Sequence, residues 1–416
     1  MGYMLTGLGW TLGVLCWSVG LVWGGWIDRP LAQAAPLAES LAAPFAAVGT
    51  AHPNIIPPDP TTNPTHGIPD ISGISGTPTP ITSQLSLTGP TGTLSVTVES
   101  QRGGRITAFA WDGATVLQGP DVDPQNYGST LWVSPQSRWG WPPSASIDRS
   151  PYRVIAPNPL SSALPSQPLR SCDDPTNGTA GPVTNRDVAN RDGANRDGVN
   201  PTIHPNPSNS LTLTSAPSPE WGVQVTKTLE LSLRSDQIPQ LLLTYDLKNC
   251  RQVAVTYAPW EVSRVSAGGL SFYGAQTLPF GVEPFPMPVT QQAQGIVWWD
   301  HRRSGSIDQQ YRDQKLFGDA AEGWLAHLDG ALLFLKQFED VGPADQAPGE
   351  GEIEIYVNGD RTYVEMEVQG PYRRIEPGES LRWQVKWSLH PLPPALAGSA
   401  ADDRSIAKWV RRLVLG

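Results

Sequence analysis

Residues 223–233 read VQVTKTLELSL, and residues 241–247 read LLLTYDL. Polar and apolar side chains alternate along the first segment, as they do in a β-strand with one face in the core and the other in solvent. Residues 93–100, TLSVTVES, show the same alternation. These segments predict antiparallel strands, because no helical pattern separates them as it would in a parallel sheet.

Further strand-length segments are bounded by turn residues such as Gly103-Gly104 and Asp112-Gly113. Ala258-Pro259-Trp260 is expected to separate two of them. Many short strands with little helix predict an all-β sandwich or barrel. The further predicted strands are residues 105–111, 115–117, 253–257, 261–265, 296–299, 323–328, 331–338, 352–357, 363–368 and 381–389.

Residues 399–415 have the periodicity of a helix. Aspartates occupy the first turn and basic residues come later, which suits the helix dipole. Ile406, Trp409, Val410 and Leu413 form one apolar face. We expect this C-terminal amphipathic helix either to dock on the sheet domain or to contact a membrane surface through its basic side.

The chain has 416 residues and a net charge of -10. An acidic chain without a basic surface is not expected to bind nucleic acid. Residues 35–82 are rich in Pro, Thr, Gly and Ser and predict a flexible tether. We therefore expect a β domain over residues 83–395, followed by the helical segment 396–416.

A low-complexity insert over residues 171–210 interrupts this domain. Asn-Arg-Asp recurs in it with a period of five, from Asn185 onward. An array of Asp and Asn turns that binds calcium is conceivable, but an arginine in every unit favours a solvated loop.

The N-terminal residues 1–34 predict export. Residues 5–26 are apolar and uncharged, and Ala32-Gln33-Ala34 resembles a signal-peptidase site. The apolar segment is also long enough to anchor the chain in a membrane. Either a cleaved signal or an uncleaved membrane tether places the main domain outside the cytoplasm, in the periplasm or secreted.

Cys172 and Cys250 lie outside the apolar N-terminal segment. In an exported protein they could form a disulfide, and two free thiols are the alternative. The sequence has no CxxC or HExxH motif and only six histidines. We therefore predict no metal and no other cofactor.

Residues 126–143, NYGSTLWVSPQSRWGWPP, concentrate three tryptophans and one arginine. Trp132, Trp139 and Trp141 offer flat apolar surfaces, and the Arg138 guanidinium offers several hydrogen-bond donors. This combination suits a pocket for a ring-shaped polar ligand such as a sugar. It also suits a packed loop, and the sequence leaves both open.

The order of four segments resembles the galactose-mutarotase-like (aldose 1-epimerase) superfamily, and an uncharacterised bacterial branch of it. The segments are GGRI at residue 103, the tryptophan-rich loop, TKTLELS with LLLTYDLKN, and EIEIYVNGDRTYVEMEVQGPYRRIEPGESLRW from residue 352. The similarity covers residues 84–152 and 211–393. It implies an antiparallel β-supersandwich with a cleft across one face. Enzymes of the superfamily interconvert sugar anomers or epimers, and other members bind carbohydrate.

The resemblance implies a catalytic base within an E-x-Q pattern, which Glu367-Val368-Gln369 matches. Glu365 lies two residues earlier and thus on the same face of the strand. Two neighbouring carboxylates repel each other, which could raise the pKa of one. Alternatively both are solvated or pair with Arg373 or Arg374.

The superfamily's catalytic histidine has no counterpart in residues 253–265, VAVTYAPWEVSRV. Either Glu261 or Tyr257 replaces it, or the acid function is lost. His301 and His327 are unplaced alternatives that we expect to be structural.

Trp260 and Lys315 complete the predicted substrate-binding residues, together with Glu365 and the four residues of the tryptophan-rich loop. Alternatively these tryptophans pack in the core or in a loop, and Lys315 is solvated. The sequence thus predicts an exported protein that binds a saccharide in a Trp-lined cleft. The alternatives are an isomerase that uses Glu367 as its base and a non-catalytic cell-envelope scaffold.

Overall fold

A computed structural model describes residues 81–155, 172, 209–275, 279–281, 290–293, 295–302, 313–397 and 403–415. The predicted signal or anchor and tether lie outside these residues, except for the last residues of the tether. Apart from Cys172 and residues 209–210, the predicted insert also lies outside them. Within the described part of the chain, no helix is both long and apolar enough to cross a membrane.

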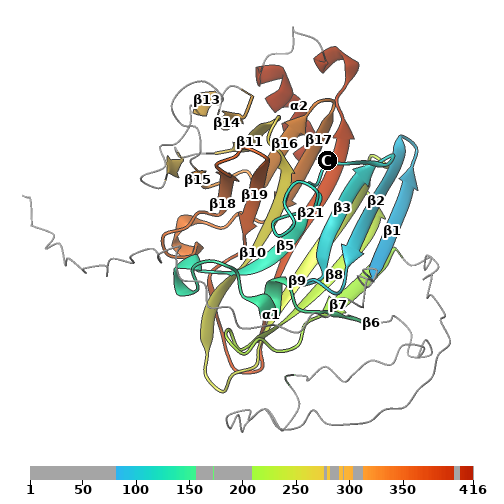
Figure 1. Ribbon diagram of the computed structural model, residues 1–416. Coiled ribbons are helices and arrows are strands. Elements are labelled where there is room, and N and C mark those ends of the chain that lie inside the picture. The colour runs from blue at the N-terminus through green and yellow to red at the C-terminus, as the bar shows by residue number, and fades with distance from the viewer. Residues whose placement is uncertain are drawn as a thin grey trace, which may run out of the picture. The chain divides into compact units, whose positions relative to one another are not determined.

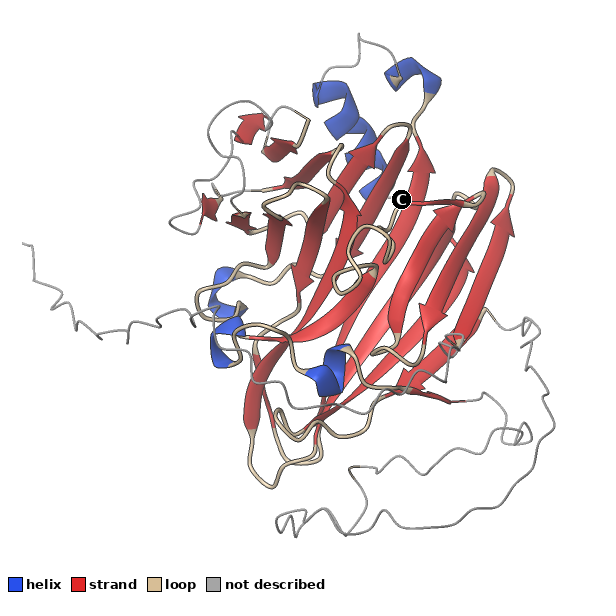
Figure 2. Ribbon diagram, in the orientation of Figure 1, coloured by secondary structure: helices blue, strands red, loops and turns tan. Residues whose placement is uncertain are grey.

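Two antiparallel sheets make up most of the described structure (Figures 1 and 2). The predicted all-β sandwich with a short C-terminal helix is confirmed. The first sheet has the strand order β1-β2-β3-β5-β10-β19-β18-β15-β12, with β4 beside β3 and β20 beside β10. Its strands are β1 (Thr82–Gly89), β2 (Gly92–Glu99), β3 (Arg105–Trp111), β4 (Ala114–Thr115), β5 (Ser129–Ser134), β10 (Val255–Ser266), β12 (Phe280–Gly281), β15 (Gln314–Gly318), β18 (Ile353–Val357), β19 (Tyr363–Gln369) and β20 (Arg373–Ile375).

The second sheet has the strand order β13-β14-β11-β16-β17-β21-β9-β8-β7-β6. Its strands are β6 (Arg153–Ile155), β7 (Ser210–Thr214), β8 (Val223–Leu233), β9 (Pro239–Asn249), β11 (Leu270–Gly274), β13 (Thr290–Ala293), β14 (Ile296–Asp300), β16 (Trp324–Asp329), β17 (Leu332–Phe338) and β21 (Ser380–Pro391). The short helices are η1 (Gln136–Arg138), α1 (Ala145–Asp148), η3 (Pro343–Asp345) and η4 (Pro394–Leu396), and α2 (Asp403–Leu415) is longer.

The main core lies between the two sheets. Leu94, Val96 and Val98 on β2 are completely buried, as their alternation predicts. Residues from both sheets, such as Phe109 and Trp387, contact each other in this core, with ring centroids 5.2 Å apart. Burying a large apolar side chain in this way contributes about 1.5–3 kcal/mol.

Helix α2 docks on the outer face of the second sheet. Its Ile406, Trp409 and Val410 are buried in a cluster that includes Phe272 and Trp324 of the sheet. Arg411 adds a hydrogen bond from Nε to Glu322 Oε2 at 2.9 Å. The apolar face of the helix is therefore covered by the protein's own sheet.

Strand β10 runs without a break through Pro259, so the prediction of two strands separated by Ala258-Pro259-Trp260 is wrong. Proline lacks a backbone N–H, so a strand tolerates it where no hydrogen bond between neighbouring strands needs that donor. The Pro259 carbonyl accepts a hydrogen bond from Gly370 N–H at 2.9 Å, just beyond the end of β19. The missing N–H therefore costs only a bond at a strand end.

Cys172 and Cys250 are joined by a disulfide whose Cα atoms are 5.1 Å apart. Of the two alternatives that the sequence leaves open, the structure has the bonded one.

Candidate functional site

Polar side chains gather on the outer face of the first sheet, opposite the main core. The alternation of strands β18 and β19 separates the two faces: Ile353, Ile355, Met366 and Val368 point into the core. The intervening residues therefore point outward. The polar outer face carries Ser134 of β5, Trp260 and Arg264 of β10, Glu365, Glu367 and Gln369 of β19, Glu354 of β18 and Lys315 of β15.

Glu354 and Glu367 face each other across β18 and β19, where their Cα atoms are register partners. Both side chains are completely buried. Lys315 forms an ion pair with Glu354, and its Nζ lies 3.5 Å from Glu367 Oε2. Two buried carboxyl groups thus share one ammonium group, and we call these three residues the carboxyl pair with Lys315.

A chain of hydrogen bonds fixes the pair from one side. Gln369 Nε2 donates to Glu354 Oε1 at 2.7 Å, and Ser134 Oγ donates to Gln369 Oε1 at 2.8 Å. The second hydrogen bond orients the Gln369 amide, so that its nitrogen faces Glu354. Gln369 of the E-x-Q pattern therefore acts on Glu354 and not on Glu367.

Burial sets the protonation of this group. It raises the pKa of Glu354 to about 7, and Lys315 opposes this shift. Burial also raises the pKa of Glu367 well above its usual value. Burial by itself would lower the pKa of Lys315, but Glu354 and Glu367 outweigh it and raise that pKa. Near neutral pH the pair can therefore hold a proton on one carboxyl while the other pairs with the lysine.

Two polar atoms beside the carboxyl pair have no hydrogen-bond partner among the described residues. They are Oε1 of Glu367, an acceptor, and Nε1 of Trp260, a donor. Lys315 Nζ lies 5.1 Å from the centre of the Trp260 ring, so it contacts both residues. A buried polar atom without a partner costs about 1–3 kcal/mol, which makes two in one place notable.

Glu365 lies on the same face as Glu367, as its spacing predicts. Its Oε1 accepts from Arg264 Nε at 2.9 Å, and both side chains are buried. Arg373 and Arg374, the expected alternative partners, instead pair with Asp345 and Glu376. Glu365 therefore forms a buried ion pair with Arg264.

The tryptophans form a packed cluster rather than the walls of an open cleft. Trp132 and Trp260 are buried, and Trp132 meets Trp139 and Trp260 edge to face at 5.8 and 5.2 Å. The space between Trp132 and Trp139 is about 10 Å³, room for one water molecule and not for a sugar. The prediction that these side chains together line a cleft is not supported by their packing.

Trp141 and Arg138 remain at the surface. The Trp141 side chain is 59% exposed and its ring lies 6.0 Å from Trp132. Arg138 lies 5.5 Å over the Tyr257 ring and donates to the Tyr372 hydroxyl at 3.4 Å. The exposed Trp141 ring contacts Trp132, Trp132 contacts Trp260, and Trp260 lies beside Lys315 of the carboxyl pair.

Glu261 lies on the opposite face of β10 from Trp260, within the main core. It pairs with Lys336 Nζ at 2.9 Å and accepts hydrogen bonds from Tyr245 at 2.6 Å and Trp387 at 3.0 Å. Glu261 cannot share a ligand with Glu367, because the sheet separates them. The suggested alternative, Tyr257, also points into the core and donates to the Trp221 carbonyl at 3.2 Å.

The two histidines left unplaced by the sequence meet at Ser271. His301 Nε2 lies 2.8 Å from Ser271 Oγ, and His327 Nδ1 lies 2.9 Å from it. Burial lowers the pKa of His327 to about 4 and that of His301 well below its usual value. Both rings are therefore neutral at pH 7 and are hydrogen-bonded to the same serine.

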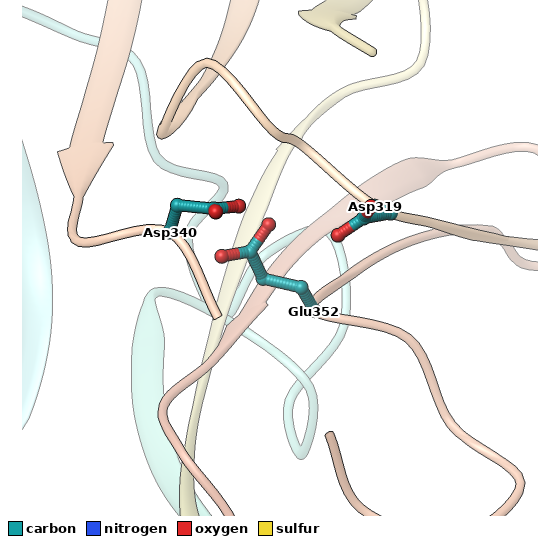
Figure 3. Close-up of side chains that lie close together, drawn as sticks. All are labelled: Asp319, Asp340 and Glu352. Carbon is teal, nitrogen blue, oxygen red and sulfur yellow. The ribbon is translucent and has the colours of Figure 1, made fainter. Parts of the chain in front are cut away.

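Three carboxylates outside the polar face, Asp319, Asp340 and Glu352, converge between loops (Figure 3). One oxygen of each lies within 4.8 Å of the others, so they are the described residues that could hold a cation. Glu352, however, accepts backbone N–H groups of Val341 at 2.6 Å and Ala320 at 2.9 Å. Burial also raises the pKa of Glu352 to about 8, and a protonated carboxyl is a poor ligand. Glu352 thus serves to fix the loops.

The sequence prediction missed Glu354 and Ser134. In EIEIYV the glutamates alternate with isoleucines, so a signal for outward-facing carboxylates was present. It could not reveal that Glu354 stands opposite Glu367, because the register between two strands depends on the whole sheet.

A family described as "Domain of unknown function (DUF4380)" matches residues 199–390. No curated protein matches the chain. Among solved structures, a protein from Synechocystis matches with a TM-score of 0.44 and 13% identity over 77% of this chain and 99% of that one. A galactose mutarotase-like protein from Lactobacillus casei matches with a TM-score of 0.43 and 9% identity over 74% of this chain and 100% of the other.

A second galactose mutarotase-like protein, from Clostridium acetobutylicum, matches with a TM-score of 0.39 and 9% identity over 74% of this chain and 95% of the other. The Lactobacillus and Clostridium proteins are both described as galactose mutarotase-like, which is the name of the superfamily that the sequence resembles.

Proposed function

We propose that the protein binds a saccharide outside the cytoplasm, on the polar outer face of the first sheet. The observation that carries this proposal is the presence of one unpartnered acceptor, Glu367 Oε1, and one unpartnered donor, Trp260 Nε1, beside Lys315. A hydroxyl group can donate to an acceptor such as Glu367 Oε1 or accept from a donor such as Trp260 Nε1. A sugar presents several hydroxyl groups on an otherwise apolar ring.

The surface above this point also suits a sugar. Trp141 offers an exposed aromatic ring, and the neighbouring Arg138 guanidinium is also exposed. A sugar ring can stack on such a tryptophan, while a guanidinium donates to its oxygens. Export is supported by residues 1–34 of the sequence and by the Cys172–Cys250 disulfide, since disulfides persist mainly in oxidising compartments.

The test is a titration of the full chain with a panel of mono- and oligosaccharides, followed by tryptophan fluorescence. A saturable change is expected, weakened about tenfold or more by Trp141→Ala. Val253→Ala is the matched control, because Val253 is equally exposed (63%) on the surface but is not part of the polar face. A flat response across the panel, or equal binding by both variants, would contradict the proposal.

A second candidate is isomerisation of a sugar at its anomeric carbon, favoured by the two raised carboxyl pKa values. One group must remove the proton of the anomeric hydroxyl while another protonates the ring oxygen. After ring opening and rotation, the reverse transfers close the ring on the other face. For Glu367 to act as the base, the single proton of the pair must first move from Glu367 to Glu354, which then supplies the proton that the missing histidine would have given.

This candidate is tested by measuring anomerisation of each bound sugar by polarimetry. Wild type should exceed the spontaneous rate, and Glu367→Gln and Glu354→Gln should each abolish the excess while largely keeping binding. If wild type binds sugar but does not exceed the spontaneous rate, the binding function stands and isomerisation is refuted.

A further inference from the structure

A third carboxyl group lies beside the carboxyl pair with Lys315. It belongs to Glu350, in the loop between η3 and β18. Burial is the main cause of the raised pKa of Glu354, and the charge of Glu350 adds to it, so the two carboxyl groups lie close together. Glu350 Oε1 accepts from the backbone N–H of Gln136 at 2.5 Å. This hydrogen bond fixes the loop against the segment that follows β5.

The three carboxyl groups use their oxygens unequally. Glu354 accepts from Gln369 through Oε1 and pairs with Lys315 through Oε2. Glu367 Oε2 lies 3.5 Å from the same lysine nitrogen. The remaining oxygens, Glu350 Oε2 and Glu367 Oε1, are buried and have no hydrogen-bond partner among the described residues. Both are therefore open to a ligand that donates hydrogen bonds.

The charges of this group do not balance. Among the described residues, Lys315 is the one cation that forms an ion pair with any of the three carboxyl groups. Arg264, on the same face, is already paired with Glu365 at 2.9 Å. Near neutral pH the carboxyl pair holds one proton, so Lys315 balances its other carboxyl and the Glu350 carboxylate keeps no counter-charge. A negative charge left over beside buried groups favours a cationic ligand.

The surroundings of the group already accommodate an ammonium ion. Lys315 Nζ lies 5.1 Å from the centre of the Trp260 ring and 5.4 Å from that of Phe317. The faces of aromatic rings attract cations. The Lys315 side chain is 17% exposed, whereas Trp260 and Glu367 are completely buried, so solvent reaches the group on the lysine side. Carboxylates and aromatic rings together thus provide an environment for a positively charged nitrogen.

We propose that the saccharide bound at this face is an amino sugar, in which a protonated amino group replaces one hydroxyl group. This inference rests on the proposed saccharide binding and names the class of sugar. The amino group donates to Glu350 Oε2 and supplies the missing positive charge. The hydroxyl groups of the ring remain available to Glu367 Oε1 and Trp260 Nε1. A hydrogen bond between two charged groups is stronger than one from a hydroxyl group, so a neutral sugar binds more weakly.

The probes are glucosamine and galactosamine, titrated into the full chain at pH 6 and followed by tryptophan fluorescence. At this pH an amino group is protonated. Glucose and galactose are the matched neutral ligands, and the N-acetylated sugars keep the nitrogen without its charge. On the ring that binds, glucose-like or galactose-like, the amino sugar is expected to bind about tenfold or more tightly than both counterparts.

Two variants locate the amino group. Glu350→Gln keeps an oxygen for the Gln136 N–H but places an NH₂ group where the free carboxylate oxygen was. It should bind the amino sugar about tenfold more weakly and the neutral sugar within about twofold of wild type. Glu379→Gln is the matched control and should keep the preference, because Glu379 is exposed in the turn before β21 and does not belong to the polar outer face. Circular dichroism verifies that each variant is folded.

The outcomes separate this inference from the proposed function. If a neutral sugar binds as tightly as its amino counterpart, or if Glu350→Gln keeps the preference, the amino sugar is refuted and saccharide binding stands. If Glu379→Gln loses the preference as Glu350→Gln does, general attraction of a cation to an acidic chain explains it, and the amino sugar at Glu350 is again refuted. If no sugar binds at all, the inference and the proposed function are refuted together.

Discussion

Replacing Lys336 with methionine should destabilise the protein strongly, because it breaks an ion pair between the two sheets. Lys336 of β17 and Glu261 of β10 are both completely buried, with Nζ 2.9 Å from Oε1. At that distance and an effective dielectric constant of about 20, the attraction is about 6 kcal/mol. Nζ also donates to the Met366 carbonyl at 2.9 Å. Methionine keeps most of the side-chain volume but neither interaction.

Part of this attraction only offsets the loss of water. Burial lowers the pKa of Lys336 although Glu261 opposes that shift, so removal from water outweighs the pairing. Tyr245 and Trp387 continue to donate to Glu261 in the variant and stabilise its charge. We therefore expect Lys336→Met to cost about 3–5 kcal/mol, the range for a buried charge that loses its partner.

The measurement is urea unfolding at pH 7, followed by tryptophan fluorescence. The double variant Lys336→Met/Glu261→Gln carries no unpaired charge. Its amide oxygen can accept from Trp387 while its amide nitrogen donates to the Tyr245 hydroxyl, so it should cost at least about 2 kcal/mol less than the sum of the two single changes. Lys386→Met, at an exposed lysine, should change stability by no more than about 0.5 kcal/mol. A cost below about 1 kcal/mol for Lys336→Met, or additive single changes, would refute a structural role for the pair and return Glu261 to consideration as a functional residue.

Three more changes test the electrostatics and the cross-link. Burial raises the pKa of Glu354 to about 7, so the stabilisation that this group contributes is present below about pH 4.5 and is lost as the pH rises through 7. Urea unfolding at several pH values should show that wild type loses about 3 kcal/mol of stability over this range and that Glu354→Gln does not. Burial lowers the pKa of His327 to about 4, so stability is lost as the pH falls from 6.5 to 4, and the same measurement on His327→Gln should show a flatter acid limb; an unchanged limb would contradict it. The Cys172–Cys250 disulfide spans a sequence separation of 78, so reduction should cost about 4.5 kcal/mol by loop entropy and lower the thermal midpoint, whereas the double serine variant should not respond to the reductant.

Much of the fold is determined by local pattern. Strand β8 has the bounds that the alternation of residues 223–233 predicts, because a period of two can bury only one face. The amphipathic helix near the C-terminus follows from its own periodicity in the same way. The failure at Pro259 has an equally specific reason: whether a missing N–H matters depends on where the neighbouring strand ends, and β19 ends at Gln369.

The candidate site depends on the tertiary structure. The sequence places Glu365 and Glu367 on one face of a strand. Trp260 and Glu261 are consecutive residues, so they lie on opposite faces of theirs. The sequence does not say which face meets the core, and Glu261 is therefore predicted as a catalytic partner of Glu367. Only the packing of the two sheets turns Glu261 toward Lys336, and only the register of β18 and β19 brings Glu354 opposite Glu367.

Side-chain identity and spacing by themselves determined most of the strands, the helix and the shared face of Glu365 and Glu367, because these depend on neighbours along the chain. The partner of each buried charge and the closure of the tryptophan cluster were decided by contacts between residues far apart in sequence. Such contacts depend on register and on the lengths of neighbouring strands, since a shift of one residue turns every side chain to the opposite face.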